Sequence, residues 1–187
     1  MGTEVSVLAR LDADVLAERA NEDIEAFAEL YRRYLCPIYR FVRAQVADDA
    51  TAEDITAQVF FRALRSAQTF RGEGSYESWL FRIAQNSVSS WYRDRSRGDI
   101  AVESVPESAD PSPSPASHLI LEEARDVLWR TVAQLPSNQR EVVAMRYLSD
   151  LSMDEIAKLT RRSRGAVRIL LHRARSKLRK ILEGTKR

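Results

Sequence analysis

Apolar residues near the C-terminus of the chain recur with the spacing of a helix that buries one face. The steps between them are four, three, four and four residues, at Val167, Leu171, Ala174, Leu178 and Leu182. Four arginines and a histidine advance at the same pace, about a quarter turn away, at Arg164, Arg168, His172, Arg175 and Arg179. The pattern predicts an amphipathic helix with one packed face and one cationic face.

A shorter helix is expected directly before this basic one. Ser152 and Glu155 have the spacing of a capping box, and the residues that follow supply a short apolar face. The polar run Thr160–Ser163 then ends the helix, and Ser163 is suited to cap the next. Residues 161–180 carry nine Lys and Arg and no acid. A short helix, a tight turn and a basic helix predict a helix-turn-helix that enters the DNA major groove.

The first half of the chain, residues 23–98, also has helical spacing throughout. Pro37 is expected to kink or interrupt the first long helix. Thr51 is expected to cap the second helix and Ser75 the third. Trp79 and Trp91, in the third helix, are assigned mainly to the core. No alternating strand pattern persists, so an all-α fold is expected.

Between the two helical parts, residues 99–117 combine four prolines, several serines and acids, and no aromatic residue. Such a segment cannot bury a core, so it is interpreted as a flexible linker. The predicted organisation is an N-terminal extension of uncertain order (1–22), a helical bundle (23–98), the linker (99–117) and a helix-turn-helix domain (118–187).

Composition narrows the possible functions. The net charge is only +2 although the isoelectric point is about 8.8, so the basic charge is concentrated locally. Cys36 is the one cysteine, which excludes an intrachain disulfide and fits a reducing compartment. With no long apolar run and no signal pattern, the chain is expected to be cytoplasmic and not inserted in a membrane.

An enzymatic function is not expected. His118 and His172 have no carboxylate, cysteine or serine partner at a recognisable catalytic or metal-binding spacing. The chain also lacks a glycine-rich phosphate loop. We therefore expect no catalytic residues, no bound metal and no cofactor.

Three segments together resemble the extracytoplasmic-function (ECF) sigma factors, the smallest type of bacterial sigma subunit. Residues 51–64 (TAEDITAQVFFRAL) resemble region 2.2, and residues 70–86 (FRGEGSYESWLFRIAQN) resemble regions 2.3 and 2.4. Residues 135–143 (LPSNQREVV), with 155–157, 165–168 and 171–175, resemble region 4. The helix-turn-helix alone is common to many regulators, but the three motifs in this order are specific.

The resemblance implies a factor that binds core RNA polymerase, reads the −35 element as duplex and melts the −10 element of promoter DNA. A dedicated anti-sigma factor is a further partner that such proteins often have. The polymerase-binding face is assigned to Asp54, Gln58, Phe61, Arg62 and Arg65. Capture of −10 DNA is assigned to Phe70, Arg71, Phe81, Arg82, Asn86 and Arg93, because aromatic rings stack unpaired bases and an amide can pair with a base edge. Contact with −35 DNA is assigned to Arg161, Arg162, Ser163, Arg164, Arg168, His172, Arg173 and Arg175.

Two departures from the family pattern matter. Relatives usually have glycine where this chain has Arg161, so either a left-handed residue there is strained by roughly 1 kcal/mol or the turn differs from that of the relatives. Relatives often have Gln-Glu at Ala57-Gln58, next to the assigned polymerase face. The alternative function is a stand-alone helix-turn-helix regulator, which would bind duplex DNA without polymerase.

Overall fold

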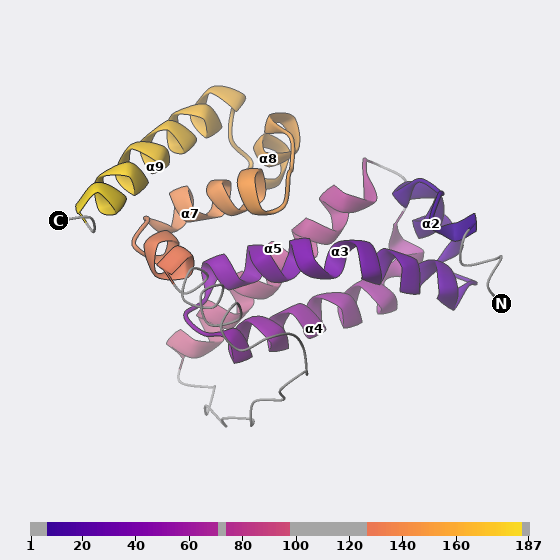
Figure 1. Ribbon diagram of the computed structural model, residues 1–187. Coiled ribbons are helices and arrows are strands. Elements are labelled where there is room, and N and C mark those ends of the chain that lie inside the picture. Colours follow the sequence, from indigo (N-terminus) through magenta and orange to yellow (C-terminus); the bar gives the residue numbers. More distant parts are fainter. Residues whose placement is uncertain (1–6, 71–73, 98–126, 185–187) are drawn as a thin grey trace, which may run out of the picture. The chain divides into compact units, whose positions relative to one another are not determined.

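The computed structural model describes residues 7–70, 74–97 and 127–184. They are helical, with no strand in these ranges (Figure 1). The chain divides into an N-terminal unit, Met1–Val42 with Ala52–Ile100, and a C-terminal unit, Ala101–Arg187 with Arg43–Thr51. The boundary between Ile100 and Ala101 falls in the predicted linker, which lies outside the described residues. No helix in the described ranges is long and apolar enough to cross a membrane.

The described residues of the first half of the chain include the short helix α2 and three long helices. In order, these elements and a short 3-10 turn are α2 (Ala13–Arg19), α3 (Ile24–Gln45), α4 (Asp49–Arg65), η1 (Ala67–Thr69) and α5 (Tyr76–Ser96). The helix α2 belongs to the segment whose order the sequence left uncertain, yet Leu16 and Ala17 are buried. The N-terminal extension is therefore part of the packed unit from residue 7 onward.

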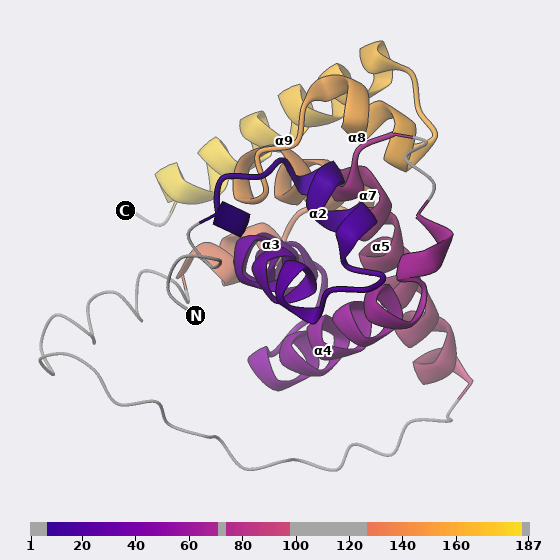
Figure 2. The same ribbon diagram turned by 90° about the vertical axis from the view of Figure 1, so that its right-hand side faces the viewer.

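Aromatic contacts join the three long helices, which lie alongside one another (Figure 2). Tyr31 of α3 meets Phe60 of α4 edge-on, with ring centroids 4.7 Å apart. Phe41 of α3 meets Phe81 of α5 in the same way at 5.5 Å. Such pairs add to the free energy gained from burying the rings. The interior of the bundle is closed by aliphatic side chains that are at most 1% exposed, among them Leu30, Ile38, Ile55, Val59 and Leu80.

Two expectations about helix boundaries are corrected, namely an interruption at Pro37 and a cap at Thr51. Pro37 lies inside α3, which continues without interruption from Ile24 to Gln45. The flanking turns are held by packing of Ile38 and Phe41, which are at most 1% exposed, so the lost hydrogen bond does not end the helix. The N-cap of α4 is Asp48 and not Thr51, because the Asp48 carboxylate accepts the Thr51 N–H at 2.8 Å and the Thr51 hydroxyl at 3.0 Å.

The second half of the chain is a small helical unit. Residues 127–133 are helical, and after them come α7 (Ser137–Val143), a π-helical turn η2 (Ala144–Leu148), α8 (Met153–Thr160) and α9 (Arg164–Gly184). Both α7 and α8 pack against α9. The core between them contains Met145, Leu151, Ile156, Val167 and Ala174, each at most 1% exposed.

The predicted helix-turn-helix is confirmed, including its caps. Ser152 and Glu155 form both hydrogen bonds of the capping box at the start of α8. The Ser163 hydroxyl accepts the Ala166 N–H at 3.1 Å at the start of α9. Between them, Arg161 is left-handed, with φ 53° and ψ 41°. The Arg162 N–H reaches back to the Ala157 carbonyl at 3.0 Å, which closes the end of α8.

The left-handed Arg161 yields a stability prediction. Glycine adopts this conformation without the steric cost of a Cβ, so Arg161→Gly should raise the free energy of unfolding of the C-terminal unit by about 1 kcal/mol. The measurement is urea-dependent amide hydrogen exchange in α8 and α9 of the full chain. Arg162→Gly is the matched control, since it loses the same charge at a residue without positive φ. Equal changes in both variants would contradict the prediction.

Candidate nucleic-acid interface

The helix α9 presents its cations to solvent along the face that the sequence predicts. Val167, Leu171 and Ala174 are at most 7% exposed, whereas the assigned −35 residues are all exposed. These exposed residues are Arg161, Arg162, Ser163, Arg164, Arg168, His172, Arg173 and Arg175. Among the described residues, no hydrogen bond or ion pair engages the side chains of Arg168, His172 and Arg175. These three side chains are therefore available to an external partner.

Arg164 differs from the other cations because it has an internal partner. Its Nε lies 3.4 Å from Oδ1 of Asp154, so the first residue of α9 is paired with the first turn of α8. Both side chains are more than 60% exposed, and such surface pairs contribute little to stability. The pair nevertheless lowers the positive charge at this point, which leaves Arg168 as the first unpaired cation on the helix.

Two residues on the outer face of α9 were missed by the sequence reasoning. Ile169 is 53% exposed, one position after Arg168. A Cβ at Gly165, one turn earlier, would meet only the Ser163 hydroxyl at 3.9 Å, so nothing inside the protein requires glycine there. The signal was present in the sequence, since Ile169 falls outside the buried stripe of Val167 and Leu171. An exposed isoleucine beside a side-chain-free position is suited to close contact with an apolar group.

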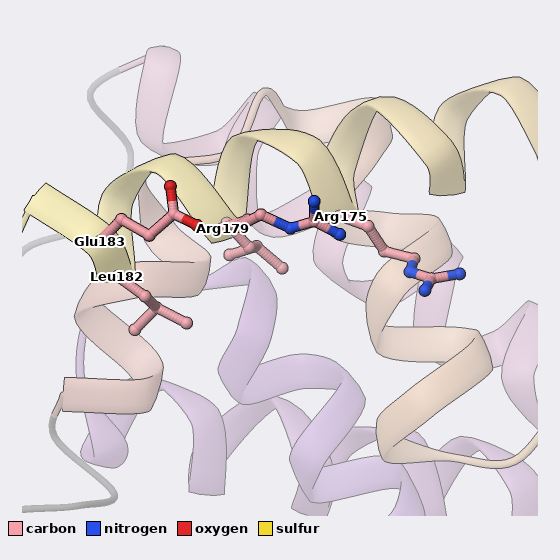
Figure 3. Close-up of a pocket in the computed structure, with 5 residues that line it drawn as sticks. Arg175, Arg179, Leu182 and Glu183 are labelled. Atoms are coloured by element: carbon pink, nitrogen blue, oxygen red, sulfur yellow. The ribbon is translucent and has the colours of Figure 1, made fainter.

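The apolar stripe of α9 is not buried along its whole length, which corrects the expectation for its C-terminal end. Leu182 is 48% exposed, and Leu178 is only half-buried. The two leucines line a shallow hollow with Arg175, Arg179 and Glu183 (Figure 3). The last turns of α9 therefore carry both charged and apolar exposed groups.

In the first half of the chain, α5 has a second polar face. Ser75 caps this helix as expected, because its hydroxyl accepts the Ser78 N–H. Arg82, Asn86 and Arg93 are all exposed, and their spacing of four and seven residues places them along one side of the helix. The opposite side is closed by Leu80, Phe81, Ala84 and Val88. Arg71, also assigned to this site, lies outside the described residues.

An aromatic cluster lies at the N-terminal end of this polar face. The ring of Phe70 is 5.7 Å from Tyr76 and 5.8 Å from Trp79, and Tyr76 is 5.5 Å from Trp79. Phe70 and Trp79 are half-buried, so parts of both rings remain accessible. Trp79 was assigned to the core, but its position one turn before Arg82 and two turns before Asn86 joins it to the polar face.

The other residues of this region are more enclosed or differently placed. Tyr76 is only 3% exposed, and Tyr34 packs on it with ring centroids 5.7 Å apart. Burial, with the negative charge of Glu77 as the next cause, raises the pKa of Tyr34 to about 12. Trp91, also assigned to the core, is half-buried, and the guanidinium of Arg95 lies 5.2 Å from its ring.

Phe81 was assigned to DNA capture, and the structure corrects this assignment. The side chain is 0% exposed and packs on Phe41 in the center of the bundle. Deleting the ring of a buried phenylalanine in such a core lowers the stability by about 3–5 kcal/mol. Contact with DNA would require a comparable disruption, so Phe81 supports α5 from within. Its spacing to Ala84 and Val88 already matched the buried stripe.

The five residues assigned to polymerase binding lie on one exposed face of α4. Asp54, Gln58, Phe61, Arg62 and Arg65 are all exposed, and the last four line one surface hollow with Ser66. Phe61 is 60% exposed, with the Arg65 guanidinium 5.7 Å from its ring. Arg62 also donates to the Ser87 hydroxyl of α5 at 3.1 Å, so it has a structural contact as well. An exposed phenylalanine among cations is typical of a protein-binding surface.

Comparisons with known proteins show the family of this chain. The model of "Sigma-70 region 2" matches residues 30–98, and that of "Sigma-70, region 4" matches residues 125–178. The ECF RNA polymerase sigma-E factor of Escherichia coli is 30% identical over 176 residues, which cover 89% of this chain and 92% of the relative. The chain belongs to the ECF sigma factors of the sigma-70 family. It is thus an RNA polymerase sigma factor that directs promoter-specific transcription.

Other ECF sigma factors show the same likeness. BldN of Streptomyces coelicolor is 32% identical over 170 residues, which cover 89% of this chain but 64% of that relative. The solved structure of CnrH in complex with the cytosolic domain of CnrY has a TM-score of 0.71 and 25% identity, covering 92% of this chain and 99% of that one. RpoE of Bartonella quintana, solved with the anti-sigma factor NepR, has a TM-score of 0.65 and 22% identity, covering 84% and 96%. The all-α fold predicted from the sequence is confirmed.

Proposed function

We propose that this sigma factor divides promoter recognition between its two exposed cationic faces. The α9 face reads the −35 element as duplex, and the α5 face with Phe70 and Trp79 captures an unpaired base of the −10 element. The α4 face around Phe61 binds core polymerase. The observation that carries the proposal is the half-buried ring pair of Phe70 and Trp79 at the N-terminal end of the face that bears Arg82 and Asn86, because duplex reading alone has no use for accessible rings.

The physical chemistry of capture supports this division. An unpaired base gains stacking energy on an aromatic ring, and Asn86 offers both a donor and an acceptor to its edge. Arg82 and Arg93, on the same side of α5, can neutralise the neighbouring phosphates. On α9, Arg168 suits bidentate contact with guanine, and the exposed Ile169 suits contact with a thymine methyl group.

In vitro transcription with purified core polymerase tests the proposal as a whole. Promoter-specific initiation that depends on this chain supports the sigma mechanism. The alternative, a stand-alone regulator, would bind duplex promoter DNA but leave core polymerase unable to initiate specifically. A sigma factor has a non-catalytic role and works where polymerase and DNA are, so we place the chain in the cytoplasm. The complex of CnrH with the cytosolic domain of CnrY suggests that a dedicated regulatory partner also binds this chain.

The α4 face generates a prediction about binding to core polymerase. Phe61→Ser should weaken binding to core polymerase by roughly 30-fold, since a buried aromatic anchor at an interface contributes about 2 kcal/mol. Asp54→Lys should weaken it less. Fluorescence titration of core polymerase with labelled full-length chain gives the affinities. Glu53→Lys is the control, because this exposed acid points about 100° away from Asp54. Unchanged affinity for Phe61→Ser would remove this face from the interface.

The α5 face generates a prediction about open-complex formation. Phe70→Ala and Asn86→Ala should reduce open-complex formation by roughly 5- to 150-fold, because stacking on a protein ring, or hydrogen bonding of an amide to a base edge, contributes about 1–3 kcal/mol per base. Closed-complex binding should change much less. Permanganate footprinting at matched promoter occupancy measures the opening, with Glu18→Ala, at an exposed acid of α2, as the control. Footprints equal to those of the unmodified factor would count against the capture site.

The α9 face generates a prediction about recognition of the −35 element. Arg168→Ala should relax base preference at one −35 position, with a loss of about 1–3 kcal/mol of discrimination. Arg175→Ala should instead weaken binding to every sequence and flatten its salt dependence, as expected for a phosphate contact. Holoenzyme titrations over a set of −35 variants at two salt concentrations separate the two effects. If Arg168→Ala weakens all variants equally, Arg168 contacts the backbone and does not read a base.

A further inference from the structure

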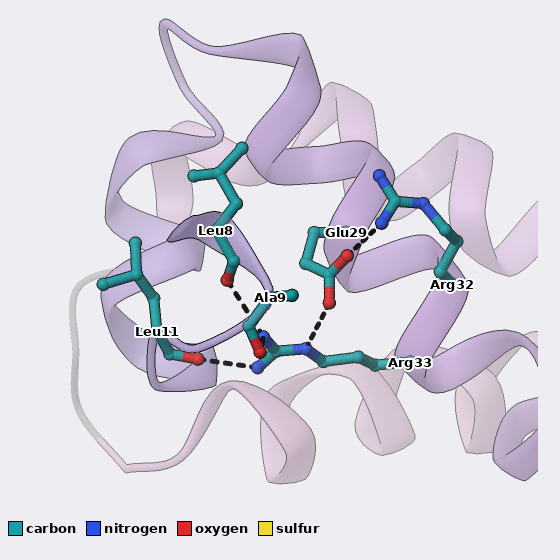
Figure 4. Close-up of polar contacts among 6 residues, drawn as sticks. All are labelled: Leu8, Ala9, Leu11, Glu29, Arg32 and Arg33. Atoms are coloured by element: carbon teal, nitrogen blue, oxygen red, sulfur yellow. Dashed lines mark hydrogen bonds and ion pairs between the residues drawn. The ribbon is translucent and has the colours of Figure 1, made fainter. Parts of the chain in front are cut away.

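The N-terminal segment, residues 7–19, precedes the part of the chain that the region 2 model matches. It is nevertheless held firmly on α3 by one side chain (Figure 4). The guanidinium of Arg33 donates to three backbone carbonyls of this segment, those of Leu11 at 2.7 Å, Ala9 at 2.9 Å and Leu8 at 3.1 Å. Three bonds from one planar group fix both the position and the direction of this segment.

Glu29 orients the arginine that makes these bonds. Its carboxylate accepts from Nε of Arg33 at 2.8 Å and also pairs with Arg32. The Glu29 side chain is only 8% exposed, so this pairing is better shielded from water than a surface ion pair. Leu8 and Leu16 add apolar contact, since they are 7% and 0% exposed. The segment is therefore an integral part of the N-terminal unit.

From this anchored segment, Asp14 reaches the start of α5. Its Oδ1 accepts the backbone N–H of Tyr76 at 2.5 Å, a bond between residues 62 positions apart. Tyr76 is the first residue of α5, where the N–H has no partner within the helix. A carboxylate here also interacts favourably with the positive end of the helix dipole. Asp14 is itself held in α2, where its own N–H donates to Asp12 at 3.0 Å.

Tyr76 is the center of the aromatic cluster beneath the proposed capture site. Its ring contacts Tyr34 at 5.7 Å, Phe70 at 5.7 Å and Trp79 at 5.5 Å. Gly74, just before the cap of α5, has φ +102°, a conformation that fits glycine. The Asp14 bond therefore holds the backbone of the residue against which Phe70 rests.

We propose that Asp14 is a positioning residue for −10 base capture, acting through Tyr76 on the ring of Phe70. This inference rests on the proposed role of Phe70 in capture. Asp14 does not touch DNA in this mechanism. Its carboxylate fixes the first turn of α5, so the ring of Phe70 is already in place when a base leaves the duplex. Pre-positioning removes an ordering cost from the opening step and leaves the initial encounter with the promoter unchanged.

The test uses holoenzyme that contains the full chain, and it separates closed-complex affinity from the rate of isomerisation to the open complex. Asp14→Ala should slow isomerisation by about tenfold, the effect of losing one hydrogen bond to a charged group. Its closed-complex affinity should stay within about twofold. Asp14→Asn keeps an acceptor oxygen and should recover a rate within about threefold of the unmodified factor. Glu18→Ala, which removes an exposed acid of α2, should change neither quantity.

Phe70→Ala and the double variant Asp14→Ala/Phe70→Ala complete the design. If Asp14 acts through Phe70, the double variant should isomerise no more slowly than Phe70→Ala alone. A slow Phe70→Ala with a normal Asp14→Ala overturns this inference and leaves the capture site intact. A Phe70→Ala variant that isomerises at the rate of the unmodified factor overturns both this inference and the proposed capture site. Equal losses of closed-complex affinity and isomerisation rate in Asp14→Ala, without recovery in Asp14→Asn, would show general destabilisation and also overturn it.

Discussion

The orientation of α5 and of α9, each about its own helix axis, is the constraint on which the functional faces of this molecule depend. Each helix buries one apolar stripe, at Leu80, Ala84 and Val88 in α5 and at Val167, Leu171 and Ala174 in α9. Once these stripes are buried, helix geometry leaves Asn86 and Arg168 exposed. The functional faces are thus set by the packing on the opposite side.

The free energies of the two effects show that packing of the apolar stripe determines which residues are exposed. Like charges one turn apart, such as Arg164 and Arg168, destabilise a helix by about 0.2–0.5 kcal/mol per pair. Burying one valine or leucine stabilises it by about 1.5–3 kcal/mol. The core therefore outweighs the repulsion along the cationic row of α9. Binding to phosphates would relieve that repulsion, so the exposed cationic row favours an anionic partner.

Local signals in the sequence predicted much of this structure. The capping box at Ser152 and the cap at Ser163 depend on neighbours within a few residues, and both are confirmed. Arg161 is left-handed, which is one of the two alternatives that the sequence left open. Errors arose where tertiary contacts decide. Phe70 and Phe81 are the same residue type near one helix, but only Phe81 enters the core, against Phe41 of α3. Periodicity with Ala84 and Val88 could have shown this.

The anchoring of residues 7–19 could not have been predicted in the same way. The acceptors for Arg33 are backbone carbonyls, which no residue type marks, and the donor for Asp14 is a backbone N–H 62 positions away. The cap at Asp48 was missed for a different reason, since Thr51 and Asp48 are both good caps and only the position of the first turn separates them.

Tethered cleavage of promoter DNA tests the division of labour between the two faces most directly. A chelated iron that generates hydroxyl radicals would be attached in holoenzyme to a cysteine at Ser89 of α5 or at Ser176 of α9, both exposed, with Cys36 replaced by serine. We predict cleavage around the −10 element from position 89 and around the −35 element from position 176. Cleavage at the same element from both positions, or at neither, would contradict the account.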